Sequence, residues 1–155
     1  MENMNKENEE QKVGMRYYKA ILYFIAWVSI ALNLTAIILT ILGTFYEGGA
    51  DLVYDEYPIL RVLDILYIIT IFVVICVEIG AWFGLKNFKA YAPGLFMSVL
   101  LINALLPFIY STVLLFVADV ADMFTVLART PLALVYYFVS RNYFNNEERA
   151  MLFRN

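Results

Sequence analysis

Histidine is absent from this chain of 155 residues, and cysteine occurs once, as Cys76. A zinc site needs three or four ligands, usually His and Cys, so no zinc site is expected. A serine or cysteine hydrolase with a histidine base is excluded for the same reason. Because no pair of nucleophile and base and no phosphate-binding loop stands out, we expect a protein that is not an enzyme and that holds no metal or cofactor.

Charged residues are also scarce, at 16% of the chain, and the net charge is -3. No basic stripe is present to neutralise phosphates, so no nucleic-acid partner is expected. Apolar residues make up 63% of the chain instead. They form runs of about 20 residues, which indicate helices that cross a lipid bilayer rather than the core of a soluble domain.

Four such runs predict an all-α fold, an antiparallel transmembrane four-helix bundle that forms a single domain. The spans are expected at about residues 18–44, 60–85, 90–117 and 119–141. Residues 1–15 are polar and acidic, unlike the basic start of a cleaved signal peptide, so we expect a disordered tail before a retained first helix. Residues 142–155 form a second polar tail.

The basic residues indicate how the chain lies across the membrane. They precede the first span, join the second to the third, and follow the fourth: Lys6, Lys12, Arg16, Lys19, Lys86, Lys89, Arg141, Arg149 and Arg154. The other two connections are acidic and have only Arg61 at their border. The positive-inside rule therefore predicts that both termini are cytoplasmic, which an even number of spans requires.

One arginine, Arg129, lies well inside the fourth span, where a guanidinium costs about 2.5 to 3.5 kcal/mol and needs a partner. A rise of 1.5 Å per residue from the nearest basic residue puts Arg129, Asn33 and Asn103 at a depth of about 18 to 21 Å, and Glu78 at about 12 Å. These four residues are predicted to form an intramembrane polar cluster. Glu78 is the expected partner of Arg129, and Asp64 is its rival.

Two interpretations of the predicted cluster stay open. In the first, its members form a hydrogen-bonded clasp that fixes the order and rotation of the helices. This interpretation favours an accessory, regulatory or immunity-type membrane component that works through partner binding or oligomerisation. In the second, Glu78 accepts protons or cations, Arg129 holds anions, and helix kinks at Pro107 and Pro131 act as hinges. This interpretation favours a small oligomeric transporter or channel.

Two shorter patterns lie in the second span. Arg61 and Asp64 are three residues apart and share a helix face, so they are expected to neutralise one another near the outer interface. Gly80 and Gly84 form a GxxxG pattern, a spacing that permits close approach of another helix.

The second half of the chain also contains several short motifs in a definite order. A basic turn and a proline open the third span (Lys86 to Pro93), and an arginine in the fourth span precedes an aromatic run and a serine-arginine ending (Arg129, Tyr136-Tyr137-Phe138 and Ser140-Arg141). In these features the chain resembles the bacterial four-span inner-membrane family of unknown function typified by YdgK. The resemblance and the small size imply a multi-pass protein of a bacterial plasma membrane, but they supply no activity.

Overall fold

The computed structural model describes residues 16–44, 46, 50–118, 130–146 and 153. Within these ranges the chain is helical and contains no strand, which confirms the predicted all-α class. Three of its helices are long and apolar enough to cross a membrane: Arg16–Ile41, Pro58–Lys86 and Ala92–Val117. They fall on the first three predicted spans. The fourth is described from Thr130 onward.

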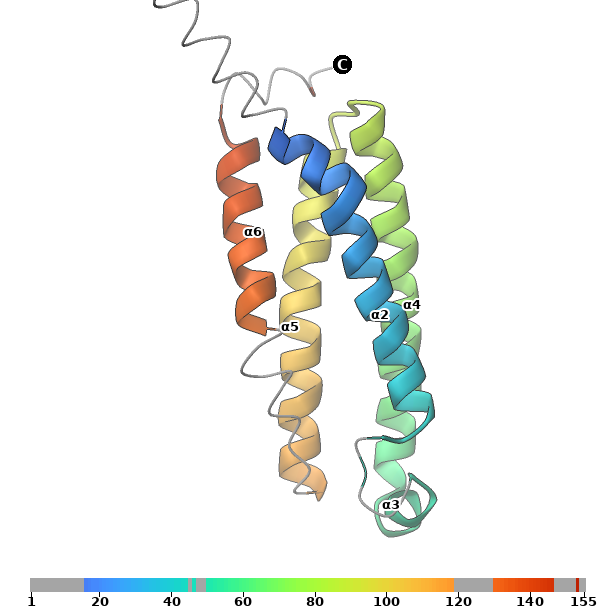
Figure 1. The fold of residues 1–155 in the computed structure, drawn as a ribbon. Helices are drawn as coiled ribbons and strands as arrows, with labels where there is room; N and C mark the ends of the chain where they lie inside the picture. Colours follow the sequence, from blue (N-terminus) through green and yellow to red (C-terminus); the bar gives the residue numbers. More distant parts are fainter. Residues whose placement is uncertain (1–15, 45, 47–49, 119–129, 147–152, 154–155) are drawn as a thin grey trace, which may run out of the picture.

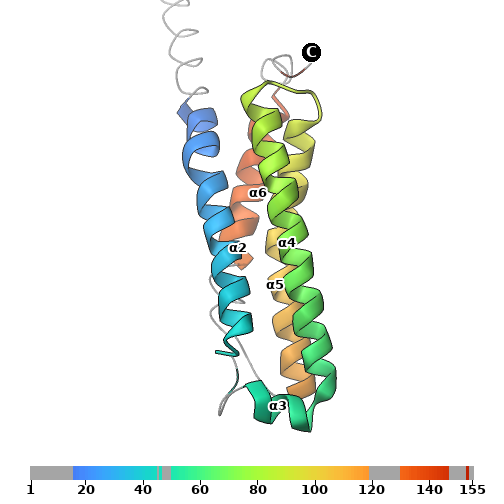
Figure 2. The same cartoon turned by 90° about the vertical axis from the view of Figure 1, so that its right-hand side faces the viewer.

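Figure 1 shows the helices in their order along the chain. The first long helix contains a π-helical segment, η1 (Ile21–Ile25), that continues into α2 (Ala26–Ile41). The short α3 (Ala50–Glu56) precedes α4 (Pro58–Lys86), α5 (Ala92–Ala118) and α6 (Thr130–Phe144). As Figure 2 shows, α3 lies at the end of α4 that is opposite the α4–α5 turn. We call these two ends of the molecule the α3 end and the turn end.

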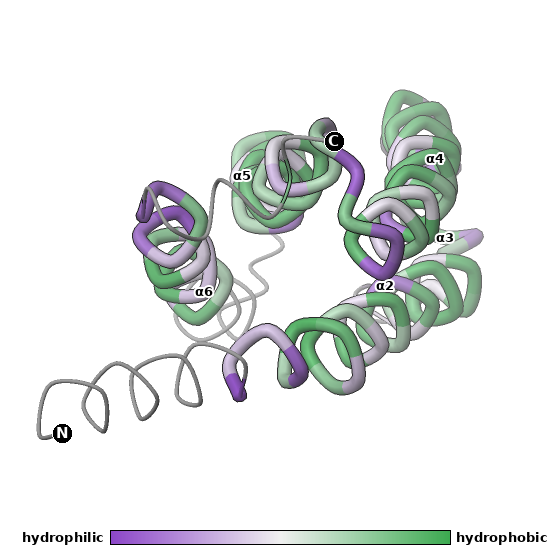
Figure 3. The backbone as a smooth tube through the Cα atoms, turned by 90° about the horizontal axis from the view of Figure 1, so that it is seen from above, coloured by the Kyte–Doolittle hydropathy of each residue, from purple (hydrophilic) through white to green (hydrophobic). Residues whose placement is uncertain are grey.

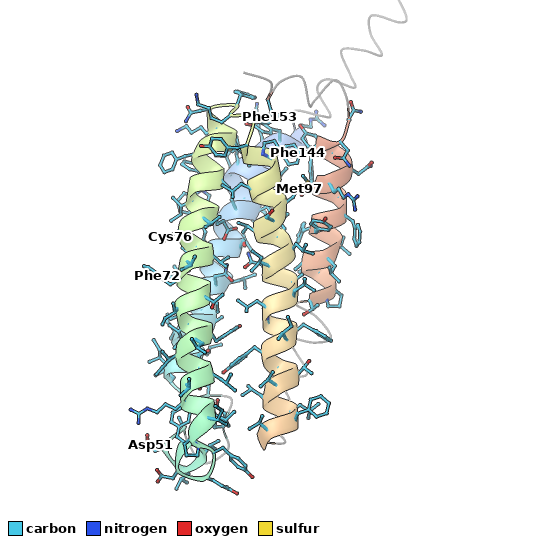
Figure 4. The ribbon with its side chains drawn as sticks, turned by 180° about the vertical axis from the view of Figure 1, so that it is seen from behind. Asp51, Phe72, Cys76, Met97, Phe144 and Phe153 are labelled. Atoms are coloured by element: carbon cyan, nitrogen blue, oxygen red, sulfur yellow. The ribbon has the colours of Figure 1, made fainter. Side chains whose placement is uncertain are left out.

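The long helices form a curved layer in the order α2, α4, α5, α6. α4 packs against both α2 and α5, and α6 packs against α5 (Figure 3). Much of the outer surface is apolar: Phe72 is 61% exposed on α4, and it points away from the other helices together with Cys76 (Figure 4). Polar side chains such as Asn33 are buried instead. This distribution is typical of helices that face lipid.

The C-terminal ends of α2 and α4 each depend on a left-handed residue in the turn that follows. α2 ends at Gly43, whose φ is +61°, and the Thr44 N–H donates to the Leu39 carbonyl over 3.2 Å, which completes a Schellman motif. A Cβ on Gly43 would lie 2.5 Å from the Cβ of Ala50, the first residue of α3. Glycine is therefore required here for its conformation and for the space it leaves.

The α4–α5 turn uses the same motif with a different residue. Phe88 has φ 52°, and the Lys89 N–H donates to the Gly84 carbonyl over 2.9 Å. A Cβ on Gly84 would lie 2.8 Å from the Cβ of Ala92, whereas one on Gly80 would meet nothing within 4 Å. Only Gly84 of the GxxxG pattern therefore serves a close approach among the described residues.

The buried side chains form three clusters along the layer. At the turn end, aromatic rings gather around Tyr18, Phe144 and Phe153 (Figure 4). The middle cluster consists of Ile30, Ala36, Tyr67, Ile71 and Ile75, with Ile37, Leu106 and Tyr110 against it. The third cluster, at the α3 end, is built on Tyr46, Leu60 and Leu114. The polar groups of the interior lie between and beside these clusters.

Candidate functional site

One face of α4 carries both of the carboxyl groups that are buried within the described helices. Asp64 is 3% exposed and Glu78 is 0% exposed. They are 14 residues apart, which is almost four helical turns, so they share a face and lie about 21 Å apart along the helix axis. Each belongs to a separate polar cluster.

The first cluster joins α2 to α5 beside Glu78. The Asn33 side-chain amide donates to Asn103 Oδ1 over 3.1 Å, and the Asn103 amide donates to the Ser29 hydroxyl over 2.9 Å. Ser29 and Asn33 also lie against the Glu78 carboxyl. Neither Glu78 Oε1 nor Oε2, however, accepts a hydrogen bond from a described residue. The structure thus brings together three of the four residues of the predicted cluster and leaves the carboxyl group unsatisfied.

Arg129, the fourth residue, lies outside the described part of the chain. The two predicted hinge residues are both in helices. Pro107 lies inside α5, which continues through it, and Pro131 is the second residue of α6 as described, a position where the missing amide costs little.

A pocket of about 80 Å³ opens between α2, α5 and α6 next to the first cluster. Four of the residues that line it are small or polar, Ser29, Asn33, Asn103 and Ala133, and we call these the floor. The other seven are aliphatic or aromatic, and we call them the rim: Phe24, Ile25, Val28, Leu32, Leu100, Leu132 and Tyr136. We call this opening between α2 and α6 the seam. The seam is thus mainly apolar and has a few polar groups on its floor.

The π-helical segment η1 borders the seam, and no pattern in the sequence predicts it. A π-helical turn shifts the backbone bonding, so that Ala26 N–H donates to the Ile21 carbonyl. The Trp82 indole of α4 donates to the Leu22 carbonyl over 2.7 Å. π-Helical turns inside α-helices are frequent at functional sites. Here the turn ties η1 to α4 and presents Phe24 to the seam.

The second cluster surrounds Asp64 at the α3 end. The Tyr46 hydroxyl donates to both carboxylate oxygens over 3.0 and 2.9 Å, and the hydroxyls of Tyr54 and Tyr110 donate over 2.6 Å each. Asp64 thereby ties the α2–α3 connection, α3 and α5 to α4. Burial first, and then the hydrogen bond to Asp64 and its charge, raise the pKa of Tyr46 and of Tyr54 above the ordinary 10.0.

This arrangement corrects the expected pairing of Arg61 with Asp64. Arg61 is exposed while Asp64 is buried, and the two form no ion pair in the structure. Tyrosine hydroxyls satisfy the carboxylate in its place. A position three residues away allowed contact, but Asp64 lies on the buried face of α4 and Arg61 does not.

The middle apolar cluster separates the two polar clusters. On the buried face of α4, Tyr67, Ile71 and Ile75 lie between Asp64 and Glu78. Ala36 and Leu106 fill the corresponding levels of α2 and α5. A mainly aliphatic layer of the described residues therefore lies between the two polar clusters.

The chain matches no protein-family model, no curated protein and no solved structure. The resemblance to the YdgK-like four-span family therefore stays a prediction, and the site is interpreted from its own geometry.

Proposed function

We propose that this chain is a non-catalytic protein of the bacterial plasma membrane, with four spans and both termini in the cytoplasm. It acts by lateral association with another membrane-embedded helix, in an accessory, regulatory or immunity-type role. The seam between α2 and α6 is the observation that carries this proposal. α2 and α6 are the two edges of the helix layer, and among the described residues no further helix covers the small and polar side chains of the seam between them.

The residues of the seam suit a helix as the occupant. Helices in lipid associate through small residues that let backbones approach and through Asn and Ser side chains that bond across the interface. Ser29, Asn33, Asn103 and Ala133 supply both kinds on the floor. On the rim, Phe24 is 63% exposed and Leu132 is 53% exposed. A helix that covered the floor would also bury these rim side chains.

The middle apolar cluster supports association over conduction by a single copy. A path for ions needs polar groups or water at every level of the membrane. Ile71, Ile75, Ala36 and Leu106 interrupt it between the two polar clusters. A function at the surface of the helix layer requires no such path.

Photocrosslinking in native membranes tests the proposal with a matched pair of positions. Phe24 on the seam and Phe72 on the outer face of α4 have the same side chain and similar exposure, 63% and 61%. A photoreactive phenylalanine analogue at Phe24 is expected to give a protein adduct, and the same analogue at Phe72 is not. The mass of the adduct separates a second copy from another partner. Lipid adducts alone at both positions would refute association through the seam.

The second candidate is the small oligomeric transporter or channel that uses Glu78 and Arg129. One observation favours it: Glu78 is buried without a hydrogen bond to a described residue. A carboxyl group without a hydrogen bond does not hold neighbouring helices together. Purified protein in liposomes would show a pH- or cation-gradient-driven flux that Glu78→Gln abolishes. Absence of any flux from the wild-type protein would exclude this candidate.

A further inference from the structure

Glu78 is the feature of the interior that neither a clasp nor a lateral interface explains. A carboxylate at 0% exposure needs a cation or several hydrogen-bond donors, because burial of an isolated charge is costly. Among the described residues, both of its oxygens accept no hydrogen bond. Asp64 on the same helix face is different, since its carboxyl group receives three tyrosine hydroxyls.

Among the described residues, the surroundings of Glu78 are polar but uncharged. α2 contributes Ser29 and Asn33, and α5 contributes Asn103 through its bonds to both of these residues. No charged side chain of the described parts of η1, α2, α5 or α6 acts on the carboxyl group, and Asp64 is about 21 Å away along α4. Uncharged donors and acceptors on two sides accommodate a neutral carboxylic acid without an ion pair.

The same three polar residues line the pocket of the seam. Glu78 lies behind them and does not line it. Ser29 and Asn33 therefore face both the pocket and the carboxyl group. The Ser29 hydroxyl can both accept and donate a proton, so it can pass one between water that enters the pocket and a buried acid, while the Asn33 amide supplies hydrogen bonds beside it.

We propose that Glu78 is a proton-binding site that exchanges with the seam pocket past Asn33 and through the Ser29 hydroxyl. The carboxylate takes up one proton to become a carboxylic acid, and it releases the same proton by the same route. This inference goes beyond the proposed lateral association and does not depend on it. Loss or gain of a charge directly behind the seam floor would alter whatever binds there.

Infrared spectroscopy of the full-length protein in lipid tests the site. A buried carboxylic acid gives a C=O stretching band that a carboxylate lacks, and deuterium shifts this band when the proton exchanges. We expect one such band that is lost in Glu78→Gln and kept in Asp64→Asn. Its amplitude falls as pH rises, and the ratio of acid to carboxylate changes about tenfold per pH unit.

Two substitutions on α6 test the route with matched controls. Ala133 lines the pocket, and Val135, two residues on, is 57% exposed on another face of the helix. Ala133→Phe fills the pocket and is expected to slow deuterium exchange of the Glu78 band, while Val135→Phe leaves the rate unchanged. Equal rates in the two variants would overturn the proposal, because the pocket would not be the route.

Arg129 provides the decisive alternative. If its guanidinium holds Glu78 as a carboxylate, the band is absent from the wild-type protein and appears in Arg129→Leu. That result would overturn the proposal in favour of an ion pair. A band of equal amplitude in the wild-type protein and in Arg129→Leu supports it. These measurements are made on the protein in lipid without its partner, so the two proposals fail separately.

Discussion

Asp64 gives the most quantitative prediction, because its partners are explicit. A hydrogen bond to a charged group contributes about 1.5 to 3 kcal/mol and one between neutral groups about 0.5 to 1.5, so Asp64→Asn loses about 1 kcal/mol per hydroxyl and about 3 kcal/mol for the three tyrosines. At the average of about 0.6 kcal/mol for a hydrogen bond within a membrane protein, complete loss of three bonds costs about 2 kcal/mol, so the expected loss is about 2 to 3 kcal/mol. Asp64→Leu removes the acceptor altogether and should cost more than Asp64→Asn.

Equilibrium unfolding in detergent measures these losses, and hydrogen exchange of α3 locates them. Arg61→Leu is the control, because Arg61 is exposed and unpaired with Asp64 in the structure. It should change the free energy of unfolding by less than about 0.5 kcal/mol. If Arg61→Leu costs as much as Asp64→Asn, the ion pair expected from the sequence is right and the tyrosine cluster is not what stabilises this end.

Three further predictions concern pH, burial and packing. The pKa values of Tyr46 and Tyr54 are raised in the folded protein, so the stability that the two hydroxyls contribute is complete below pH 10.0 and is lost as pH rises through their pKa values in the folded state. Tyrosinate absorbance should therefore appear together with faster hydrogen exchange of α3. Glu78→Leu replaces an unsatisfied carboxyl group and should raise the free energy of unfolding by about 1 to 3 kcal/mol, whereas an unchanged or lower value would mean that the group has a partner. Gly84→Ala should destabilise the protein, since its Cβ would lie 2.8 Å from another Cβ, while Gly80→Ala should not; equal melting temperatures of the two variants would contradict the close approach.

The sequence predicted the architecture well where a single physical rule decides it. Long apolar runs have one solution in lipid, which is the helix, and the first three predicted spans coincide with long helices. The shared depth of Asn33 and Asn103 followed from the rise per residue, and the structure joins them by a hydrogen bond. The depth of a residue along a straight helix can thus be predicted from the sequence.

Rotation about the helix axis was harder to predict. Arg61 and Asp64 looked like a pair because spacing says which residues are close, but not which of them faces the core. The tyrosine donors come from a loop, from α3 and from α5, so no local pattern links them to Asp64. The π-helical segment η1 could not be predicted for a similar reason. The Trp82 indole, which donates to its Leu22 carbonyl, lies 60 residues away in the sequence. Such contacts depend on tertiary packing, which a single sequence does not display.

Copurification from native membranes with two variants tests the central claim, that this protein works through the seam, most directly. The wild-type protein and Val135→Phe should carry the same bound chain, either a second copy or another membrane protein, in the same ratio. Ala133→Phe, which fills the pocket, should purify without it. If all three proteins purify with the same bound chain, or if all three purify from native membranes without one, the protein does not act through the seam.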